Sequence, residues 1–324
     1  MIERSSAIRA FLDRHGLAGA RRLPLAGDAS VRRYERLSGG PCPAVLMDAP
    51  PATLDVRPFL AVAGWLRAAG LSAPEVLAAD PVAGLVLLED LGDELFSRAL
   101  ARGGNEMLLY ETAVDILLVL HRAPPPASLP RYDDAWLLRE AELLVEWYAP
   151  TLGEPAKADY RAIWRDLLPA ARAGGDGFVY VDYHADNLLW LPARSGLARV
   201  GLLDFQDARS GPPAYDLASL LEDARRDVAP GLARAMVERY LAARSELDPD
   251  AFRAAYALLA AQRNAKILGL FSRLAQRDGK PHYLELQPRV QAHLRRDLRH
   301  PLLTPLRLWF ERHLHAGGAL ERDR

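Results

Sequence analysis

The stretch 179–205 constrains the fold of this chain more than any other. It holds an Asp-x-x-x-x-Asn pattern, from Asp182 to Asn187, directly ahead of the apolar run Leu188-Leu189-Trp190-Leu191. A second apolar run, 198–205, follows after a loop that contains proline and glycine. Short apolar runs bounded by turn residues are typical of buried strands. The stretch therefore predicts a β-hairpin with polar side chains gathered at one end.

The chain around this hairpin changes character near residue 92. Before it, short strands alternate with helices, and after it a helical periodicity dominates. Ser5 is a candidate cap for the first helix, and Gly70 a candidate end for the helix 58–69. The expected strands are 23–25, 32–37, 43–48 and 85–88, and the later helices are 95–100, 105–121, 135–147, 158–173 and most of 215–314. This order predicts an α+β fold with an N-lobe, 1–92, built on a small antiparallel sheet, and a large helical C-lobe, 93–324, with an embedded hairpin.

The polar residues of the stretch fit phosphoryl transfer. Transfer to a hydroxyl needs a carboxylate that orients the attacking oxygen and accepts its proton, with oxygen ligands for the magnesium that bridges the phosphates. Asp182 is the candidate base, and Asn187 and Asp204 are the candidate magnesium ligands. A hairpin would place these two ligands on adjacent strands, and magnesium prefers few protein oxygens together with phosphate oxygens. The alternative is a hairpin with solvated polar ends.

The composition excludes several other functions. The formal net charge is -1 and charged residues make up 26% of the chain, so a basic footprint for nucleic acid is missing. The single cysteine, Cys42, allows neither a disulfide within the chain nor a cysteine-based zinc cluster. The N-terminus lacks the apolar segment of a signal peptide, and every apolar run is too short to span a bilayer. We expect a cytoplasmic protein without nucleic-acid or membrane partners, and we expect a monomer, although the sequence leaves the oligomeric state open.

The stretch resembles the catalytic elements of aminoglycoside phosphotransferases and choline kinases. Residues 180–187 resemble their His-Gly-Asp-x-His-x-x-Asn loop, Leu203-Asp204-Phe205 their Ile-Asp-Phe/Trp element, and 215–218 their Tyr-Asp-Leu-Ala helix start. The order agrees over most of the chain, but Tyr180 stands where the family usually has histidine. The resemblance implies a protein-kinase-like fold that binds ATP and Mg²⁺ between its lobes, with the roles already given to the two aspartates and the asparagine. Asp216, in the helix start, is expected to cap its helix.

Several segments resemble one branch of this family more closely. The segments are 25–34, 45–50, 182–187 and 262–269. The branch consists of bacterial anomeric kinases that act on N-acetylmuramate and N-acetylglucosamine in cell-wall recycling. It implies an ATP-dependent sugar kinase that phosphorylates the C1 hydroxyl. Two alternatives stay open: a kinase for another small acceptor, such as an aminoglycoside or glucosamine, and a pseudokinase that acts as a scaffold.

The nucleotide contacts are expected in the first ninety residues. Backbone N–H groups of the turn 27–30 would cover the phosphates, unless it is an ordinary hairpin turn, and residues 89–91 lie where related kinases bind adenine. The lysine that kinases carry on the third strand is missing, because Met47 stands there and Lys157 is the first lysine. Arginine would replace it, with Arg33 preferred over Arg32, which points to the opposite face. The candidates are Gly27, Asp28, Ala29, Ser30, Arg32, Arg33, Met47, Glu89, Asp90 and Leu91; GTP as donor stays open.

The sugar acceptor is expected to bind the helical lobe. The candidate residues are His184, Gln206, Asp207, Arg209, Arg139, Glu146 and Trp147. Arg139 and Glu146 are seven positions apart and would share one helix face, with Trp147 as a stacking surface. His184 would either touch the sugar or brace the loop, and the helix is otherwise a surface helix with its tryptophan in the core. Mixed arginines and acids suit a neutral or carboxylated sugar better than a polycationic aminoglycoside.

Overall fold

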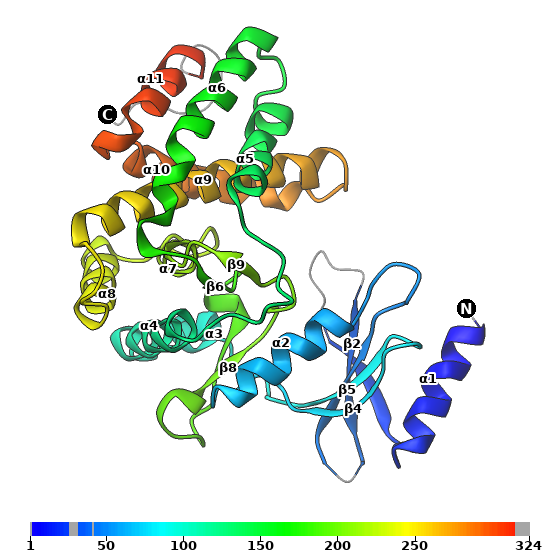
Figure 1. The fold of residues 1–324 in the computed structure, drawn as a ribbon. Helices are drawn as coiled ribbons and strands as arrows, with labels where there is room; N and C mark the ends of the chain where they lie inside the picture. Colours follow the sequence, from blue (N-terminus) through cyan, green and yellow to red (C-terminus); the bar gives the residue numbers. More distant parts are fainter. Residues whose placement is uncertain (1, 26–31, 41, 315–324) are drawn as a thin grey trace. The chain divides into compact units, whose positions relative to one another are not determined.

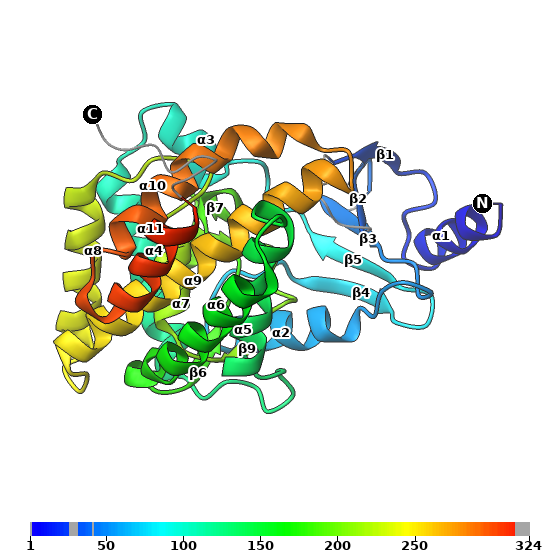
Figure 2. The same ribbon diagram turned by 90° about the horizontal axis from the view of Figure 1, so that it is seen from above.

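The computed structural model describes residues 2–25, 32–40 and 42–314 (Figures 1 and 2). The chain groups into two compact units. The first unit combines Met1–Gly103 with Asp186–Asp207, and the second combines Gly104–Ala185 with Ala208–Arg324. The predicted lobes, 1–92 and 93–324, stay predictions, because grouping by contacts does not define which segments bind nucleotide or sugar. Within the described part of the chain, every helix is too short or too polar to cross a membrane.

A five-stranded antiparallel sheet forms the centre of the first unit. Its strands lie in the order β1-β2-β3-β5-β4. They are β1 (Arg21–Pro24), β2 (Arg33–Ser38), β3 (Ala44–Asp48), β4 (Val76–Asp80) and β5 (Leu85–Glu89). The strands at 23–25, 32–37, 43–48 and 85–88 are thereby confirmed with small shifts. β4 was not predicted, because its side chains alternate between partly buried and exposed and its sequence carries no fully buried apolar run.

Two helices accompany the sheet. In α1 (Ile2–Arg14), Ile8, Phe11 and Leu12 are buried and pack with Leu37 and Leu46 of the sheet. The expected apolar face is confirmed, but the helix begins at Ile2, so Ser5 lies inside it and does not cap it. The second helix, α2 (Arg57–Ala68), ends just before Gly70, whose φ of 78° is the left-handed conformation expected of a helix stop.

The predicted hairpin is present and belongs to the first unit. Strands β7 (Leu188–Trp190) and β8 (Val200–Leu202) pair antiparallel, with Leu188 opposite Leu202. Both are shorter than expected, because the short 3₁₀ turn η4 (Gly196–Arg199) takes up the start of the second run. Beyond β8, the ring of Phe205 stacks on Phe59 of α2 at 4.9 Å. This packing connects the end of the hairpin to the rest of the unit.

The second unit is mainly helical and is built around one long helix, α9 (Pro249–Gln276), drawn in orange in Figure 2. The other segments are α4 (Glu106–Arg122), α5 (Asp134–Leu143), η1 (Leu144–Tyr148), α6 (Glu154–Leu167), η2 (Leu168–Gly174), α7 (Ala214–Leu221), α8 (Pro230–Ala243), η5 (Pro281–Leu286), α10 (Gln287–Asp297), η6 (Pro301–Leu303) and α11 (Thr304–His313). α3 (Phe96–Ala101) belongs to the first unit. A short antiparallel ribbon of β6 (Gly177–Val179) and β9 (Arg209–Gly211) was not predicted, because three-residue strands give too little pattern.

The predicted helix 135–147 splits in two. α5 ends at Leu143, and the chain continues as the π-helical turn η1. Gly269 of α9 explains the close approach at this point, because a Cβ there would collide with the backbone of Leu143 and Leu144. A change to π-helix shifts the side chains that follow. The shared face of Arg139 and Glu146 was predicted from the spacing of an unbroken α-helix, and that spacing does not apply across this change.

Candidate active site

A buried aspartate holds the loop that carries Asp182. The backbone N–H groups of Tyr180 and Val181 donate to the Asp216 carboxylate at 2.6 and 2.9 Å. Asp216 is fully buried, and His121 Nε2 lies 3.3 Å from the same carboxylate. Asp216 was expected to cap its own helix, but Pro213 occupies the cap position of α7. The carboxylate instead fixes the backbone just ahead of the candidate base.

The backbone immediately before Asp182 adopts a conformation that few residues take. Val181 has a φ of 78°, in the left-handed region that is unusual for a β-branched residue. Such a conformation costs about 1–3 kcal/mol and persists only where the surroundings impose it. The two hydrogen bonds that the N–H groups of Tyr180 and Val181 donate to Asp216 contribute to that constraint. Asp182, which directly follows this turn, is half-buried.

Tyr180 takes the place of the family's histidine by packing. Its ring is fully buried and lies edge-on to Tyr183, with ring centres 5.1 Å apart. The Tyr183 hydroxyl donates to the carbonyl of Ala113 at 2.8 Å. These aromatic rings therefore fill the interior of the loop. The tyrosine at position 180, where the family usually has histidine, affects how the loop packs.

His184 is buried and electrically neutral. Burial, followed by the charges of Arg225 and Arg263, lowers the pKa of His184 well below its usual value. A neutral side chain that is 6% exposed offers little surface to a sugar. This geometry favours the bracing role over a direct contact with the acceptor.

The candidate magnesium ligands lie at one end of the hairpin. The carbonyl of Asn187 accepts from the N–H of Leu203 at 3.0 Å, so the two segments are paired as expected. Asp204 follows with a φ of 60° and an exposed side chain. A carboxylate and an amide oxygen are suitable ligands for magnesium, which takes one or two carboxylates and fills its other positions with phosphate and water. Across the described residues, groups of three or more His, Cys, Asp or Glu side chains that could hold a metal are absent.

Gln206 and Asp207, which were predicted to face the acceptor, lie in contact with each other, and Gln206 also contacts Asp204. The Gln206 side-chain amide donates to Asp204 at 2.7 Å and to Asp207 at 3.1 Å. Gln206 is buried, whereas both carboxylates are exposed. The amide therefore orients the candidate ligand Asp204, which is a positioning role.

Tyr34 connects the sheet of the first unit with the candidate metal ligands. It pairs with Met47 across β2 and β3. Burial raises the pKa of Tyr34 to about 12, Arg32 opposes the rise, and the charges of Asp204 and Asp207 add to it. Tyr34 and Arg32 are two positions apart and share a face. Arg33 is exposed and points to the other face, so the geometry favours Arg32 over the preferred Arg33 as the phosphate ligand.

The other nucleotide candidates fall into three groups. Gly27, Asp28, Ala29 and Ser30 lie outside the described residues. Met47 is fully buried in β3. At the end of β5, Glu89 pairs with Arg194, and Asp90 accepts from Arg36 at 2.6 Å. The side chains of Glu89 and Asp90 are therefore engaged in ion pairs within the first unit. Any contact of these residues with adenine would come from their backbone.

The structure reveals an aromatic candidate that the sequence pattern did not. Trp136 of α5 is half-buried, and its Nε1–H donates to Glu140 at 3.2 Å. The Arg209 guanidinium lies 3.7 Å from the centre of its ring, and that of Arg139 lies 5.5 Å away. Trp147, the expected stacking surface, is also half-buried and lies on η1, and its role stays a prediction. A signal was present in the sequence, because Trp136 and Glu140 are four positions apart and share a helix face.

A half-buried ion pair fixes this tryptophan. Glu140 lies 2.8 Å from Lys266 Nζ and accepts from the Tyr132 hydroxyl at 2.5 Å. Burial by itself would raise the pKa of Glu140, but Lys266 and the hydrogen bonds of Tyr132 and Trp136 outweigh it and lower the pKa. Burial likewise opposes the charge on Lys266, and Glu140, Tyr215 and Asp182 raise its pKa in spite of it. Asp182 thus lies within electrostatic reach of this pair.

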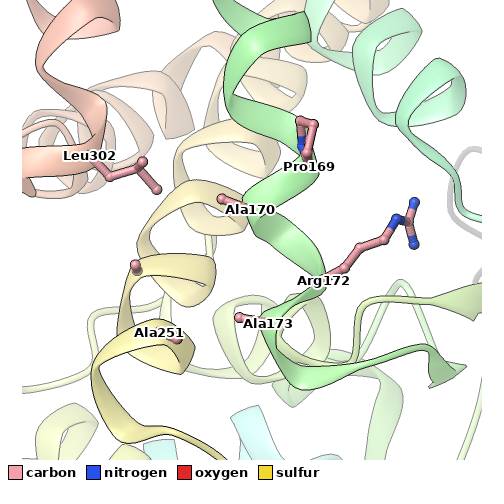
Figure 3. A pocket seen from close by; sticks show the side chains of 7 residues that line it. Pro169, Ala170, Arg172, Ala173, Ala251 and Leu302 are labelled. Atoms are coloured by element: carbon pink, nitrogen blue, oxygen red, sulfur yellow. The ribbon is translucent and has the colours of Figure 1, made fainter.

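A hollow of about 470 Å³ elsewhere in the second unit is a poor candidate site. It lies between η2, α9 and η6, and Figure 3 shows Arg172 directed away from Ala251 and Leu302. Arg172 pairs with Asp134 at 2.8 Å, which leaves an apolar lining of proline, alanine and leucine. The predicted site residues do not line it.

The sequence is similar to known phosphotransferases. Residues 22–253 match the model of the "Phosphotransferase enzyme family". A protein of Caulobacter vibrioides named N-acetylmuramate/N-acetylglucosamine kinase is 43% identical, over 96% of this chain and 97% of its own. A protein of the same name from Pseudomonas aeruginosa is 38% identical, over 84% of this chain and 82% of its own.

Two solved structures share the fold. The GDP complex of wild-type aminoglycoside 2'-phosphotransferase-IIIa has a TM-score of 0.64 at 15% identity and covers 89% of this chain and 98% of its own. The choline kinase of Streptococcus pneumoniae has a TM-score of 0.64 at 14% identity and covers 91% and 99%. At such identities the likeness concerns the fold alone, and it confirms the expected kinase-like architecture.

Proposed function

The chain belongs to the phosphotransferase enzyme family, together with relatives named N-acetylmuramate/N-acetylglucosamine kinase, and from this premise we propose its substrates and the roles of its residues. It transfers the γ-phosphate of ATP to the anomeric C1 hydroxyl of N-acetylmuramate and N-acetylglucosamine. The observation that carries the proposal is the 43% identity to the Caulobacter protein over nearly the whole of both chains. Use of ATP places the reaction in the cytoplasm.

Asp182 acts as the base. Its carboxylate accepts the proton of the C1 hydroxyl as the oxygen attacks the γ-phosphorus. The bond between the γ-phosphorus and the oxygen that bridges to the β-phosphate then breaks, and ADP leaves. The left-handed turn at Val181 and its contacts to Asp216 hold the carboxylate in place, so little of the barrier is spent on orienting it.

Asn187 and Asp204 hold magnesium. When bound, the ion neutralises charge that develops on the transferred phosphoryl group. The Gln206 amide restricts rotation of the Asp204 carboxylate. Arg32 supplies the positive charge that other kinases take from a lysine on the third strand, because it shares a face of the sheet with Tyr34, which lies near Asp204.

The alternatives have less support. A scaffold without activity has no need for a strained loop that orients an aspartate, nor for an amide that orients Asp204. An aminoglycoside is polycationic and needs an acidic site. The side chains over Trp136 are arginines. These arginines weaken the aminoglycoside alternative and favour a neutral or acidic sugar as the acceptor.

A coupled ADP-release assay tests the proposal. Wild-type enzyme is supplied with magnesium-ATP and, in turn, N-acetylmuramate, N-acetylglucosamine, glucosamine and kanamycin. Turnover with the first two sugars, lost in Asp182→Asn, supports the proposal, and phosphorus NMR of the product identifies C1. Turnover with glucosamine or kanamycin alone rejects the sugar assignment, and no turnover with any acceptor rejects catalysis of this type.

A further inference from the structure

The two proposed acceptors differ by one charged group. N-acetylmuramate carries a lactyl ether with a carboxylate, and N-acetylglucosamine has a hydroxyl at the same position. An enzyme that accepts both must tolerate the carboxylate or bind it. A binding site would need a cation with available N–H donors on the unit that carries Asp182.

Arg209 and Arg139 have the required chemistry. The Arg209 guanidinium is stacked over Trp136 at 3.7 Å, within the range of a cation–π contact. Stacking uses the face of a guanidinium and leaves its N–H groups, which lie in its plane, for a carboxylate to accept two parallel hydrogen bonds. Arg139 lies over the same ring at 5.5 Å. Two positive charges therefore meet at one half-buried aromatic ring.

The surrounding arginines are already neutralised by acids, and these two are not. Arg131 and Arg172 both pair with Asp176, at 2.9 and 2.5 Å. Within the described residues, Arg209 and Arg139 form no ion pair, and Arg209 makes only a long contact of 3.5 Å to the carbonyl of Arg131. Many of the other arginines pair with carboxylates of the chain itself. Arg209 and Arg139 are therefore complementary to the negative charge of a bound ligand.

The position of the pair is built into the fold. Arg209 lies opposite Val179 in the β6–β9 ribbon, and Asp182 follows Val179 by three residues. The Trp136 ring is fixed through its Nε1–H by Glu140, which Lys266 and Tyr132 hold in turn. The Trp136 platform, which consists of Trp136, Arg209 and Arg139, therefore lies in the same unit as the proposed base Asp182.

Resting on the proposed function, we propose that Trp136, Arg209 and Arg139 form a subsite for the carboxylate of N-acetylmuramate and set the preference between the two sugars. Arg209 receives the carboxylate as a fork. Arg139 adds a second positive charge near the same ring. Trp136 holds Arg209 in position and offers the rest of its ring to the sugar.

The test is the ratio of kcat/KM for N-acetylmuramate to that for N-acetylglucosamine. We expect Arg209→Gln to lower this ratio by about 10- to 100-fold, the loss expected for a charge-assisted hydrogen bond. Arg209→Lys keeps the charge without the fork and should lower it by a smaller factor. The matched control is Arg131→Gln, a neighbouring arginine already paired with an acid, which should leave the ratio unchanged. Equal losses for both sugars in Arg209→Gln, or an unchanged ratio, would overturn the inference.

Calorimetric binding separates this inference from the proposed catalysis. Wild-type protein without ATP should bind N-acetylmuramate more tightly than N-acetylglucosamine, and Arg209→Gln should remove the difference. Equal affinities in the wild type overturn the subsite even if the enzyme is active. A difference that disappears in the variant supports the subsite even if turnover fails. Circular dichroism of each variant confirms that it is folded.

Discussion

The loop that carries the proposed base Asp182 and the Trp136 platform belong to the same unit, yet they are held in different ways. The loop is fixed through its backbone, because two N–H groups bind the fully buried Asp216. The platform is fixed through side chains that reach the surface, where Glu140 joins Trp136 to Lys266. A backbone constraint suits a base that must stay in place for every substrate. A side-chain constraint can be altered by substitution, which suits recognition of different sugars.

The largest effect is expected at the base. Asp182→Asn keeps the size of the side chain but removes the proton acceptor, so kcat should fall by about 10²- to 10⁴-fold. The affinity for the sugar should change far less, because the platform residues are untouched. Single-turnover rates and calorimetric sugar binding measure the two quantities separately. A variant that keeps wild-type kcat would remove Asp182 from its role.

The next effect is expected at the loop anchor. Asp216→Asn replaces a charged acceptor of two backbone N–H groups by an amide with a single oxygen, at a cost of about 1.5–3 kcal/mol in the free energy of unfolding. kcat should fall with it, because Val181 is no longer constrained. Urea denaturation measures the first quantity. Asp227→Asn, at an exposed carboxylate paired with Arg289, is the control and should change stability by less than about 1 kcal/mol.

A smaller effect separates the two candidate phosphate ligands. Arg32→Gln should raise the KM for ATP by about tenfold, the loss of roughly one charged contact. Arg33→Gln, on the opposite face of the strand, should leave it nearly unchanged. Steady-state kinetics with ATP varied at saturating sugar gives both values. The reverse order would show that the strand presents Arg33 to the phosphates.

The smallest effect concerns pH. The pKa of His184 is lowered in the folded protein, so the unfolded chain binds a proton that the folded chain does not. The free energy of unfolding should therefore fall as the pH drops through the ordinary histidine range, by about 0.7 kcal/mol between pH 7 and pH 6. His184→Asn should remove this share of the pH dependence. Equal slopes in the two proteins would mean that His184 titrates normally.

The sequence predicted those structural features that depend on residues close together along the chain. The hairpin follows from two apolar runs, and the pairing of the Asn187 and Asp204 segments follows from the hairpin. β4 and the β6–β9 ribbon escaped prediction, because half-exposed or three-residue strands lack a distinct apolar pattern.

The aromatic candidate escaped prediction for a different reason. The prediction placed Trp147 on a helix, 135–147, that was taken to be unbroken, and it did not consider Trp136. The break after Leu143 coincides with close packing by Gly269, more than a hundred residues further along the chain. Periodicity within the helix itself contains no trace of that contact. The choice between Arg33 and Arg32 as the phosphate ligand stays a prediction, because the sequence alone did not give the phase of the strand.

Met47 on the third strand has a consequence for chemical labelling. Reagents that carry a nucleotide and acylate the lysine of a kinase site would find no side-chain amine in the first unit, since the chain contains only Lys157, Lys266 and Lys280. The amine of Lys266 is ion-paired with Glu140 and is a weak nucleophile while protonated. A proteome survey that relies on acylation of a lysine in the first unit would therefore miss this chain.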